Sequence, residues 1–298
     1  MSAAISVVIP AFNAERHIQE AIESVLMQTL PAKEILVVDD GSTDATAQIV
    51  RKFEGQVILV QQPNSGVSHA RNVAFARACS DWVCFLDADD TWQPNKLAVS
   101  LEYAEKDPLA TLVFSDYQTF GLQSRAVRLA ETFANWRRDM ELLSPIVCVL
   151  PSAAMVRRTV SARFPEWASV NEDAIYFNDL ADEGTVIHVP QLLVNYRQHA
   201  SSAQKQVGVG ERAGANMLQR YASDPKDRAR FAHTLLTMMK QRRESRKWHD
   251  FDAYFRILQD HWSGDRRIML QARATHLSKY IYKLKDCLER LKPAHPTE

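Results

Sequence analysis

The sequence predicts an α/β fold, in which a mostly parallel sheet is flanked by helices and followed by a helical C-terminal extension. Two observations lead to this fold class. Over residues 4–90, short apolar runs rich in Val and Ile alternate with segments whose apolar residues recur at helical spacing. This alternation is typical of a parallel sheet that is covered on both faces. Beyond Gly214 the apolar spacing is helical.

Four strands are expected in the first 90 residues, because each is a short apolar run bounded by turn residues. They are residues 5–12, 33–40, 57–62 and 81–90. The helices between them are residues 13–29, 41–53 and 68–79. Ser42 or Thr43 is the expected N-cap of the second helix. Asp90 would stand at the start of a fourth helix, over residues 91–97.

The pattern is less regular over residues 109–196. We expect strands at 110–120 and 185–197 and helices at 135–146 and 171–183. Ser169 and Glu172 fit a capping box for the last of these helices. Residues 198–214 are rich in Ser, Gly and Ala and predict a mobile loop. Over residues 270–291 a heptad seam is expected, formed by Leu270, Ala274, Leu277, Ile281, Leu284, Leu288 and Leu291.

Charge divides the 298 residues into two expected domains. Residues 1–204 contain 16 Lys and Arg against 25 Asp and Glu, a net charge of −9, whereas residues 205–298 contain 20 against 11, a net charge of +9. The first domain would have a nucleotide-sugar half over about 1–115 and an acceptor half over about 116–204. The basic second domain would pack on the acidic one, form a homo-oligomer through the heptad seam, or rest on an anionic membrane surface.

Composition narrows the class of protein. Hydrophobic residues make up 46% and charged residues 24% of the chain, which is ordinary for a soluble globular protein. The four cysteines have no metal-ligand spacing, so we expect reduced packing residues and a cytoplasmic location. No signal peptide or membrane-spanning run is expected, which leaves peripheral contact with the inner face of the membrane as the alternative. No nucleic-acid-binding motif is recognisable.

Polar side chains follow three strands of the predicted sheet. Pro10–Asn13 end the first strand, Asp39 and Asp40 end the second, and Asp87-Ala88-Asp89 end the fourth. In open parallel sheets, ligands bind beyond the carboxyl ends of the strands. Carboxylates at that edge would hold Mg²⁺ or Mn²⁺, which are commonly bound by one or two carboxylates together with substrate phosphates.

Five further residues could carry chemistry at this edge. Gly66 would permit close backbone approach, and Arg71 would meet the acids or a phosphate. Asp173, in the first turn of a helix, would serve as a general base. Arg197 and His199 would clamp a diphosphate or complete a metal site.

Each of these motifs also has a purely structural interpretation. The acids would be turn or helix-start residues, Gly66 and Arg71 an ordinary loop and helix start, and Arg197 and His199 surface residues. Trp136 and Trp167 would either pack in the core or stack on a sugar ring. The motifs together favour a ligand site more strongly than any one of them does.

Three segments resemble the family-two inverting glycosyltransferases with the GT-A fold. They are "SVVIPAFNAERHIQEAIESVLMQTLPAKEILVVDDGSTD", "NSGVSHARN" and "FLDADDTWQPNKL", which match in order and spacing across about residues 4–120. "ED" at 172–173 and "YRQHASS" at 196–202 extend the match to about residue 203. The motifs are specific for the fold and carry little information on donor and acceptor.

The resemblance implies a role for each motif residue. The nucleotide pocket would be lined by Pro10, Ala11, Phe12, Asn13 and Glu15, with Asp40 reading the base and Arg71 close by. Asp87 and Asp89 would form the DxD motif, with Asp89 the direct metal ligand. Asp173 would be the catalytic base, and His199 would approach the metal or diphosphate. The remaining nucleotide-sugar contacts would come from Gly66, Ala88 and Arg197.

The implied activity is metal-dependent transfer of a hexosyl or N-acetylhexosaminyl group, first of all from a UDP-sugar, to an acceptor hydroxyl. The product would belong to a surface polysaccharide, glycolipid or other glycan. Two alternatives stay open, namely an inactive nucleotide-sugar-binding or scaffold protein and a sugar-1-phosphate nucleotidyltransferase. Tyr176 and Phe177 stand where the family often has a bulky Trp or Leu, which puts acceptor contacts carried over from relatives in doubt.

Overall fold

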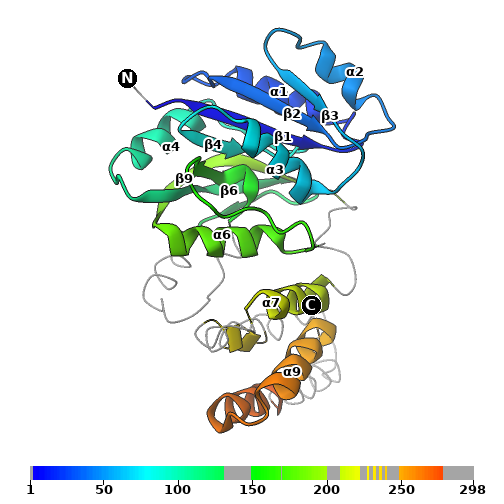
Figure 1. Cartoon of the computed structure of the whole chain (residues 1–298), viewed down its shortest axis with the longest axis vertical. Coiled ribbons are helices and arrows are strands. Elements are labelled where there is room, and N and C mark those ends of the chain that lie inside the picture. The colour runs from blue at the N-terminus through cyan, green and yellow to red at the C-terminus, as the bar shows by residue number, and fades with distance from the viewer. Residues whose placement is uncertain are drawn as a thin grey trace, which may run out of the picture. The chain divides into compact units, whose positions relative to one another are not determined.

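The computed structural model describes residues 3–130, 149–168, 170–199, 209–221, 227, 231–232, 235–236, 239 and 248–277. They fall into two compact units. The first contains the described residues up to His199, and the second contains those from Val209 onward (Figure 1). The predicted boundary after residue 204 lies outside the described residues and stays a prediction.

The first unit is built on a single sheet. Among the described strands, the order is β3-β2-β1-β4-β8-β6-β9-β5, with β7 beside β6. Six of these nine strands run in one direction, and β5, β7 and β8 run against them, so the prediction of a mostly parallel sheet is confirmed. The strands are β1 (Ile5–Ala11), β2 (Glu34–Asp39), β3 (Ile58–Gln61), β4 (Trp82–Phe85), β5 (Thr91–Trp92), β6 (Ala110–Gly121), β7 (Arg125–Val127), β8 (Ala154–Arg157) and β9 (Thr185–Gln198).

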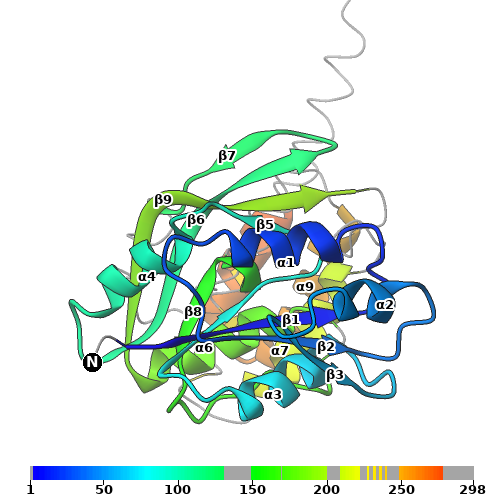
Figure 2. The same cartoon turned by 90° about the horizontal axis from the view of Figure 1, so that it is seen from above.

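Helices cover both faces of this sheet, as the sequence predicts. On one face lie α1 (Ile18–Leu26), α2 (Thr46–Arg51) and α4 (Lys96–Ala104). On the other lie α3 (Val67–Arg77) and α6 (Glu172–Glu183). Figure 2 shows α1 and α3 on opposite sides of β1. A short 3₁₀ turn, η1 (Pro151–Ala153), precedes β8.

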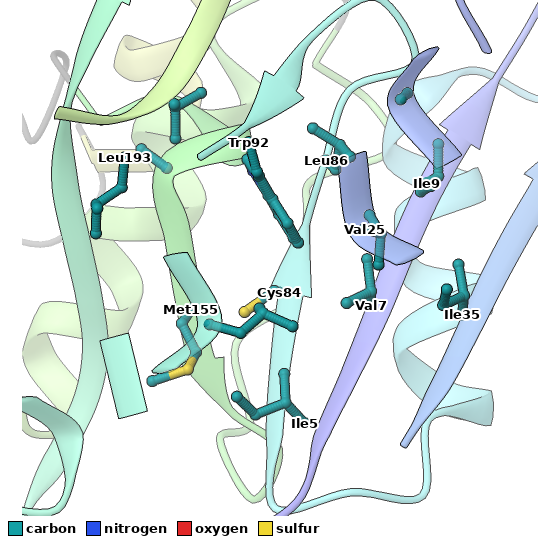
Figure 3. Packing of buried hydrophobic residues seen from close by; sticks show 14 of the residues in the cluster. Ile5, Val7, Ile9, Val25, Ile35, Cys84, Leu86, Trp92, Met155 and Leu193 are labelled. Atoms are coloured by element: carbon teal, nitrogen blue, oxygen red, sulfur yellow. The ribbon is translucent and has the colours of Figure 1, made fainter. Parts of the chain in front are cut away.

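The strands separate two hydrophobic clusters, because successive side chains of a strand point to opposite faces. Ile5, Val7 and Ile9 of β1 enter the cluster beneath α1, whereas Val8 enters the cluster beneath α3. Figure 3 shows the first cluster, in which Trp92 lies among side chains of several strands. Both clusters end at the carboxyl edge of the sheet, where polar residues take over.

Three predicted helix starts are wrong, namely those of α2, α4 and α6. Residues 91–92 form β5, and α4 begins only at Lys96, so Asp90 does not stand at a helix start. Helix α2 follows Ala45, because Ser42 and Thr43 are held by Asn13 instead of capping a helix.

Helix α6 follows Asn171, which has the left-handed φ of 63°. Glu172 is therefore the first helical residue, which is not the position that a capping box needs. Ser169, its predicted partner, lies outside the described residues, as do residues 135–146, Trp136 and most of the heptad seam.

The second unit is helical where it is described. It contains α7 (Val209–Tyr221), α9 (Trp248–Trp262) and a helical segment over residues 266–277. The predicted loop over 198–214 is therefore too long, since α7 begins at Val209. Leu270 and Leu277 of the predicted seam are 71% and 64% exposed, so they are not part of this unit's core. Among the described residues, no helix is both long and apolar enough to cross a membrane.

Candidate functional site

The carboxyl ends of β1, β2 and β4 meet at one edge of the sheet. The three strands are parallel neighbours, with Ala11 opposite Asp39 and Val8 opposite Phe85. The polar residues that follow them therefore form one rim. The structure brings these motifs together as the sequence predicts.

The loop after β1 is fastened to the loop after β2. Asn13 adopts a left-handed φ of 48°, and its Oδ1 accepts a hydrogen bond from the Thr43 N–H at 2.9 Å. Glu15 accepts one from the Ala45 N–H at 3.0 Å. Of the predicted pocket residues, Pro10 and Ala11 are buried in β1, whereas Phe12, Asn13 and Glu15 are exposed. Phe12, half exposed, presents an aromatic ring at the rim.

Asp40 is almost fully buried and organises the next loop. One carboxylate oxygen accepts hydrogen bonds from the Gln62 side chain at 2.8 Å and the Ser65 N–H at 2.9 Å. The other accepts one from the Gly66 N–H at 2.8 Å. Gly66 has a φ of 91°, which favours glycine. A nucleobase N–H would add a fourth hydrogen bond to Asp40, so its role as base reader stays a prediction.

Arg71 meets an acid of the rim, as its place in the sequence predicts. Its guanidinium donates to Asp87 at 2.7 Å and to Glu172 at 3.0 Å, whereas its expected place near the base that Asp40 would read stays a prediction. The side chain is 4% exposed and lies over the Phe164 ring. Arg71 therefore joins the end of β4 to the start of α6 by two buried, charge-assisted hydrogen bonds.

The three acids after β4 have three different surroundings. Asp87 faces Arg71, and Asp89 faces His199 with Nε2 to Oδ2 at 2.9 Å. Asp90 is fully buried and accepts hydrogen bonds from the Ser152 hydroxyl and the Arg197 N–H. Burial, with the nearby Asp87 and Asp89 charges, raises the pKa of Asp90 well above its usual range. Asp90 thus links η1 to β9 through hydrogen bonds to Ser152 and Arg197.

Ala88 and Arg197 complete this part of the rim. Ala88 packs against the core beneath α1. Arg197 donates to the Asp89 carbonyl oxygen at 2.8 Å and pairs with Glu20 of α1. The His17 ring stacks on the His199 ring with centroids 6.5 Å apart. The start of α1 therefore contributes two residues to this part of the rim. His17 precedes the helix and stacks on His199, and Glu20 in the first turn pairs with Arg197.

The residues present fit a hard divalent cation held by two protein ligands. Adjacent ligands of an octahedral Mg²⁺ or Mn²⁺ lie about 3 Å apart, because each bond is about 2.1 Å long. The Asp89–His199 distance of 2.9 Å matches that spacing. Asp87 is committed to Arg71, and in the described part of the chain no three acid, histidine or cysteine side chains converge. Substrate oxygens would have to complete such a site.

Asp173 lies half-buried in the first turn of α6, next to Glu172. Burial, followed by repulsion from Glu172, raises the pKa of Asp173 to about 7, although Arg71 acts in the opposite direction. A carboxyl group with such a pKa accepts a proton readily near neutral pH. The arrangement can therefore hold a charged ligand between Asp89 and a proton acceptor on α6.

Some residues of the site carry no signal in the sequence. Ser152 lies in an irregular segment, yet it donates to Asp90 and accepts a hydrogen bond from the Asp87 N–H at 3.0 Å. His17 and Glu20 read only as the polar face of an amphipathic helix. Tyr176 and Phe177, which put the acceptor contacts of relatives in doubt, are fully buried and pack around Phe164.

This fold and rim define a class of proteins, namely α/β domains whose ligand site lies at the carboxyl edge of the sheet. Residues 6–164 match the model of glycosyl transferase family 2, and the chain belongs to that family.

Relatives and solved structures give the same class. The chain is 40% identical over 104 residues to TuaG of Bacillus subtilis, which by its name is a glycosyltransferase of teichuronic acid biosynthesis. The match covers 33% of this chain and 41% of TuaG, so the chain spans less than half the length of that relative.

Two solved structures share the GT-A fold. TarS residues 1–349 of S. aureus with UDP-GlcNAc has a TM-score of 0.65 at 17% identity, covering 98% of this chain and 93% of that one. The mannosyltransferase PcManGT of Pyrobaculum calidifontis, with GDP-Man and Mn²⁺, has a TM-score of 0.58 and covers 93% and 88%. At such identity the likeness concerns the fold.

Replacing Arg71 should destabilise the protein strongly. Arg71→Met would leave Asp87 and Glu172 without their partner, and breaking a buried pair costs about 3 kcal/mol. Urea unfolding measures the loss, and the double variant Arg71→Met/Glu172→Gln should recover part of it. Lys106→Met, which breaks the exposed pair with Glu102, is the matched control and should have no measurable effect. Equal effects of Arg71→Met and Lys106→Met would contradict this interpretation.

Asp173 should make stability depend on pH. The folded state keeps the proton up to about pH 7, whereas an unfolded Asp loses it near pH 4. Stability should therefore fall as the pH rises from about 4 to 7, by at most about 1.4 kcal/mol per pH unit. Asp173→Asn should flatten this dependence in thermal melts, and Asp182→Asn, at the exposed far end of α6, should not. Identical pH profiles for wild type and Asp173→Asn would refute the assignment.

Proposed function

We propose that this chain is a metal-dependent inverting glycosyltransferase that transfers a hexosyl or N-acetylhexosaminyl group from a UDP-sugar to an acceptor hydroxyl. The product would be a surface polysaccharide, glycolipid or other glycan. The observation that carries the proposal is that Arg71 contacts both Asp87, in the DxD motif, and Glu172, the neighbour of Asp173. This contact fixes the expected donor position relative to the expected base.

The donor would lie along the rim. Phe12 offers a ring on which a base can stack, and Asp40 holds the loop of residues 62–66 beside it. The diphosphate would lie near Asp89, His199 and Arg197. A bound Mg²⁺ or Mn²⁺, held by Asp89 and His199, would offset negative charge on the leaving diphosphate.

Asp173 would act on the acceptor. Its carboxylate takes the proton of the acceptor hydroxyl while the hydroxyl oxygen attacks the anomeric carbon. The bond from that carbon to the diphosphate oxygen breaks in the same step, and UDP leaves. Because attack and departure occur on opposite faces, the configuration inverts without a covalent intermediate, in contrast to retaining enzymes. Above a pH of about 7 the base is in its reactive form.

The choice of UDP, the metal and the polysaccharide class rests on similarity. TarS is solved with UDP and with UDP-GlcNAc, PcManGT is solved with GDP-Man and Mn²⁺, and TuaG is named for teichuronic acid biosynthesis. An inactive nucleotide-sugar-binding protein is the alternative, and the presence of Asp87, Asp89 and Asp173 weighs against it. Family membership weighs against a nucleotidyltransferase.

Substitutions of Asp173 and of Asp89 should have different effects, the first on transfer and the second on metal-dependent binding. Asp173→Asn should keep Mn²⁺-dependent UDP binding but lose transfer by at least about 10²-fold, as expected for a general base. Asp89→Ala should lose the Mn²⁺ dependence of UDP binding itself. Calorimetry with UDP and Mn²⁺ and product detection with a panel of nucleotide sugars measure the two effects.

Asp182→Asn is the control for both assays, because it lies on the same helix and is exposed. Transfer by Asp173→Asn at the wild-type rate would remove Asp173 from the mechanism. UDP binding that is equal with and without Mn²⁺ in the wild type would contradict the metal site. Binding without any transfer in the wild type would favour the inactive alternative.

A further inference from the structure

Trp167 lies in the segment between β8 and α6 and is 45% exposed. Packing in the core, one of its two expected roles, is therefore excluded. A single exposed apolar side chain is common on protein surfaces and does not by itself indicate a binding site. What distinguishes Trp167 is the way its neighbours are held and the element that holds them.

The turn that carries Trp167 is fastened to α3 by paired hydrogen bonds. Asn72 donates to the Phe164 carbonyl oxygen at 2.9 Å and accepts from the Phe164 N–H at 3.0 Å. It also donates to Glu166 at 3.0 Å. The Ala168 N–H then closes the turn onto the Pro165 carbonyl oxygen at 3.2 Å. The indole is thus presented to solvent from a fixed backbone.

Aromatic packing fixes the same turn from below. The Phe164 ring stacks on Tyr176 of α6 with centroids 3.9 Å apart, and the Arg71 guanidinium lies over the Phe164 ring at 5.0 Å from its centroid. Ala168, directly after Trp167, is buried. The exposed Trp167 therefore lies between the buried residues Phe164 and Ala168, which hold the backbone of the turn in place.

The turn lies close to the expected catalytic base. Arg71 holds Glu172 at the start of α6, and its neighbour Asn72 holds the turn. One turn of α3 therefore positions both Trp167 and Asp173. Trp167 and Asp173 are six positions apart in the sequence, a separation that spans at most about 20 Å in an extended chain. Adjacent residues of α3 therefore anchor the Trp167 turn and the start of α6, which carries Asp173.

Glu166, the residue before Trp167, pairs with a histidine of α3. Glu166 and His69 face each other at 3.1 Å, and their side chains are 51% and 37% exposed. A sugar ring has an apolar C–H face and a rim of hydroxyl groups. An exposed aromatic face beside a carboxylate and an imidazole matches both parts.

We propose that Trp167, with Glu166 and His69, forms a subsite that binds a pyranose ring of a saccharide acceptor. The proposal rests on the proposed function and adds to it that the acceptor is itself a glycan. The indole stacks on the C–H face of the sugar ring, and Glu166 and His69 form hydrogen bonds with the hydroxyl groups of the sugar. Trp167 contacts the acceptor and takes no part in the chemical step.

The test measures saccharide binding directly. Cellobiose, lactose and N,N′-diacetylchitobiose serve as probes in the presence of UDP and Mn²⁺, with saturation-transfer NMR and titration as readouts. The wild type should bind at least one of them at millimolar concentration. Trp167→Ala should bind it about tenfold more weakly, which corresponds to about 1.4 kcal/mol, whereas Trp167→Phe, which keeps a ring, should lose only a few-fold.

Leu109→Ala is the matched control, because Leu109 is 73% exposed at the opposite edge of the sheet, before β6. UDP affinity and the melting temperature should be the same in all three variants and the wild type. Unchanged saccharide binding in Trp167→Ala, or no binding by the wild type, overturns the subsite. A parallel loss of UDP affinity or of folding in Trp167→Ala overturns it too, since Trp167 would then be structural. Saccharide binding that depends on Trp167 without any UDP binding would instead refute the proposed function and leave the subsite standing.

Discussion

The buried ion pairs of Arg71 are the constraint on which the rest of the site depends. A guanidinium that is 4% exposed needs partners on more than one side, and it finds Asp87 after β4 and Glu172 at the start of α6. Two segments 85 residues apart are thereby fixed to one helix. Removing either carboxylate would leave part of a buried charge uncompensated. The same turn of α3 also carries Asn72, so the donor edge, the expected base and the Trp167 turn share one support.

The carboxylates of the rim fall into two groups, which differ in burial and in the number of protein donors. Asp40 and Asp90 are buried and accept hydrogen bonds from several protein donors, so they hold loops in place. Asp89 and Asp173 keep partial exposure and have few protein donors. Burial, and after it repulsion from neighbouring carboxylates, raises the pKa values of Asp90 and Asp173. A cation and an acceptor proton would relieve the repulsion that remains.

The sequence predicts the parallel sheet and its rim well, because apolar runs and the polar residues that end them are local signals. It fails where a contact is made across the chain. Arg71 is expected to meet an acid or a phosphate, but the sequence does not show which acids, because its partners Asp87 and Glu172 lie 16 and 101 residues away. Asp90 reads as a helix start, but Ser152 and Arg197 bind it. Ser152 itself has no pattern to reveal it. The exposure of Trp167 likewise depends on tertiary packing.

The most direct test of the account is a crystal structure with UDP and Mn²⁺, in which anomalous scattering locates the metal. We predict that Mn²⁺ lies within bonding distance of the Asp89 carboxylate and of diphosphate oxygens. Arg71 should still join Asp87 to Glu172, and the Asp173 carboxylate should face the open side of the β-phosphate. UDP bound away from this rim, or Mn²⁺ bound without Asp89, would contradict the account.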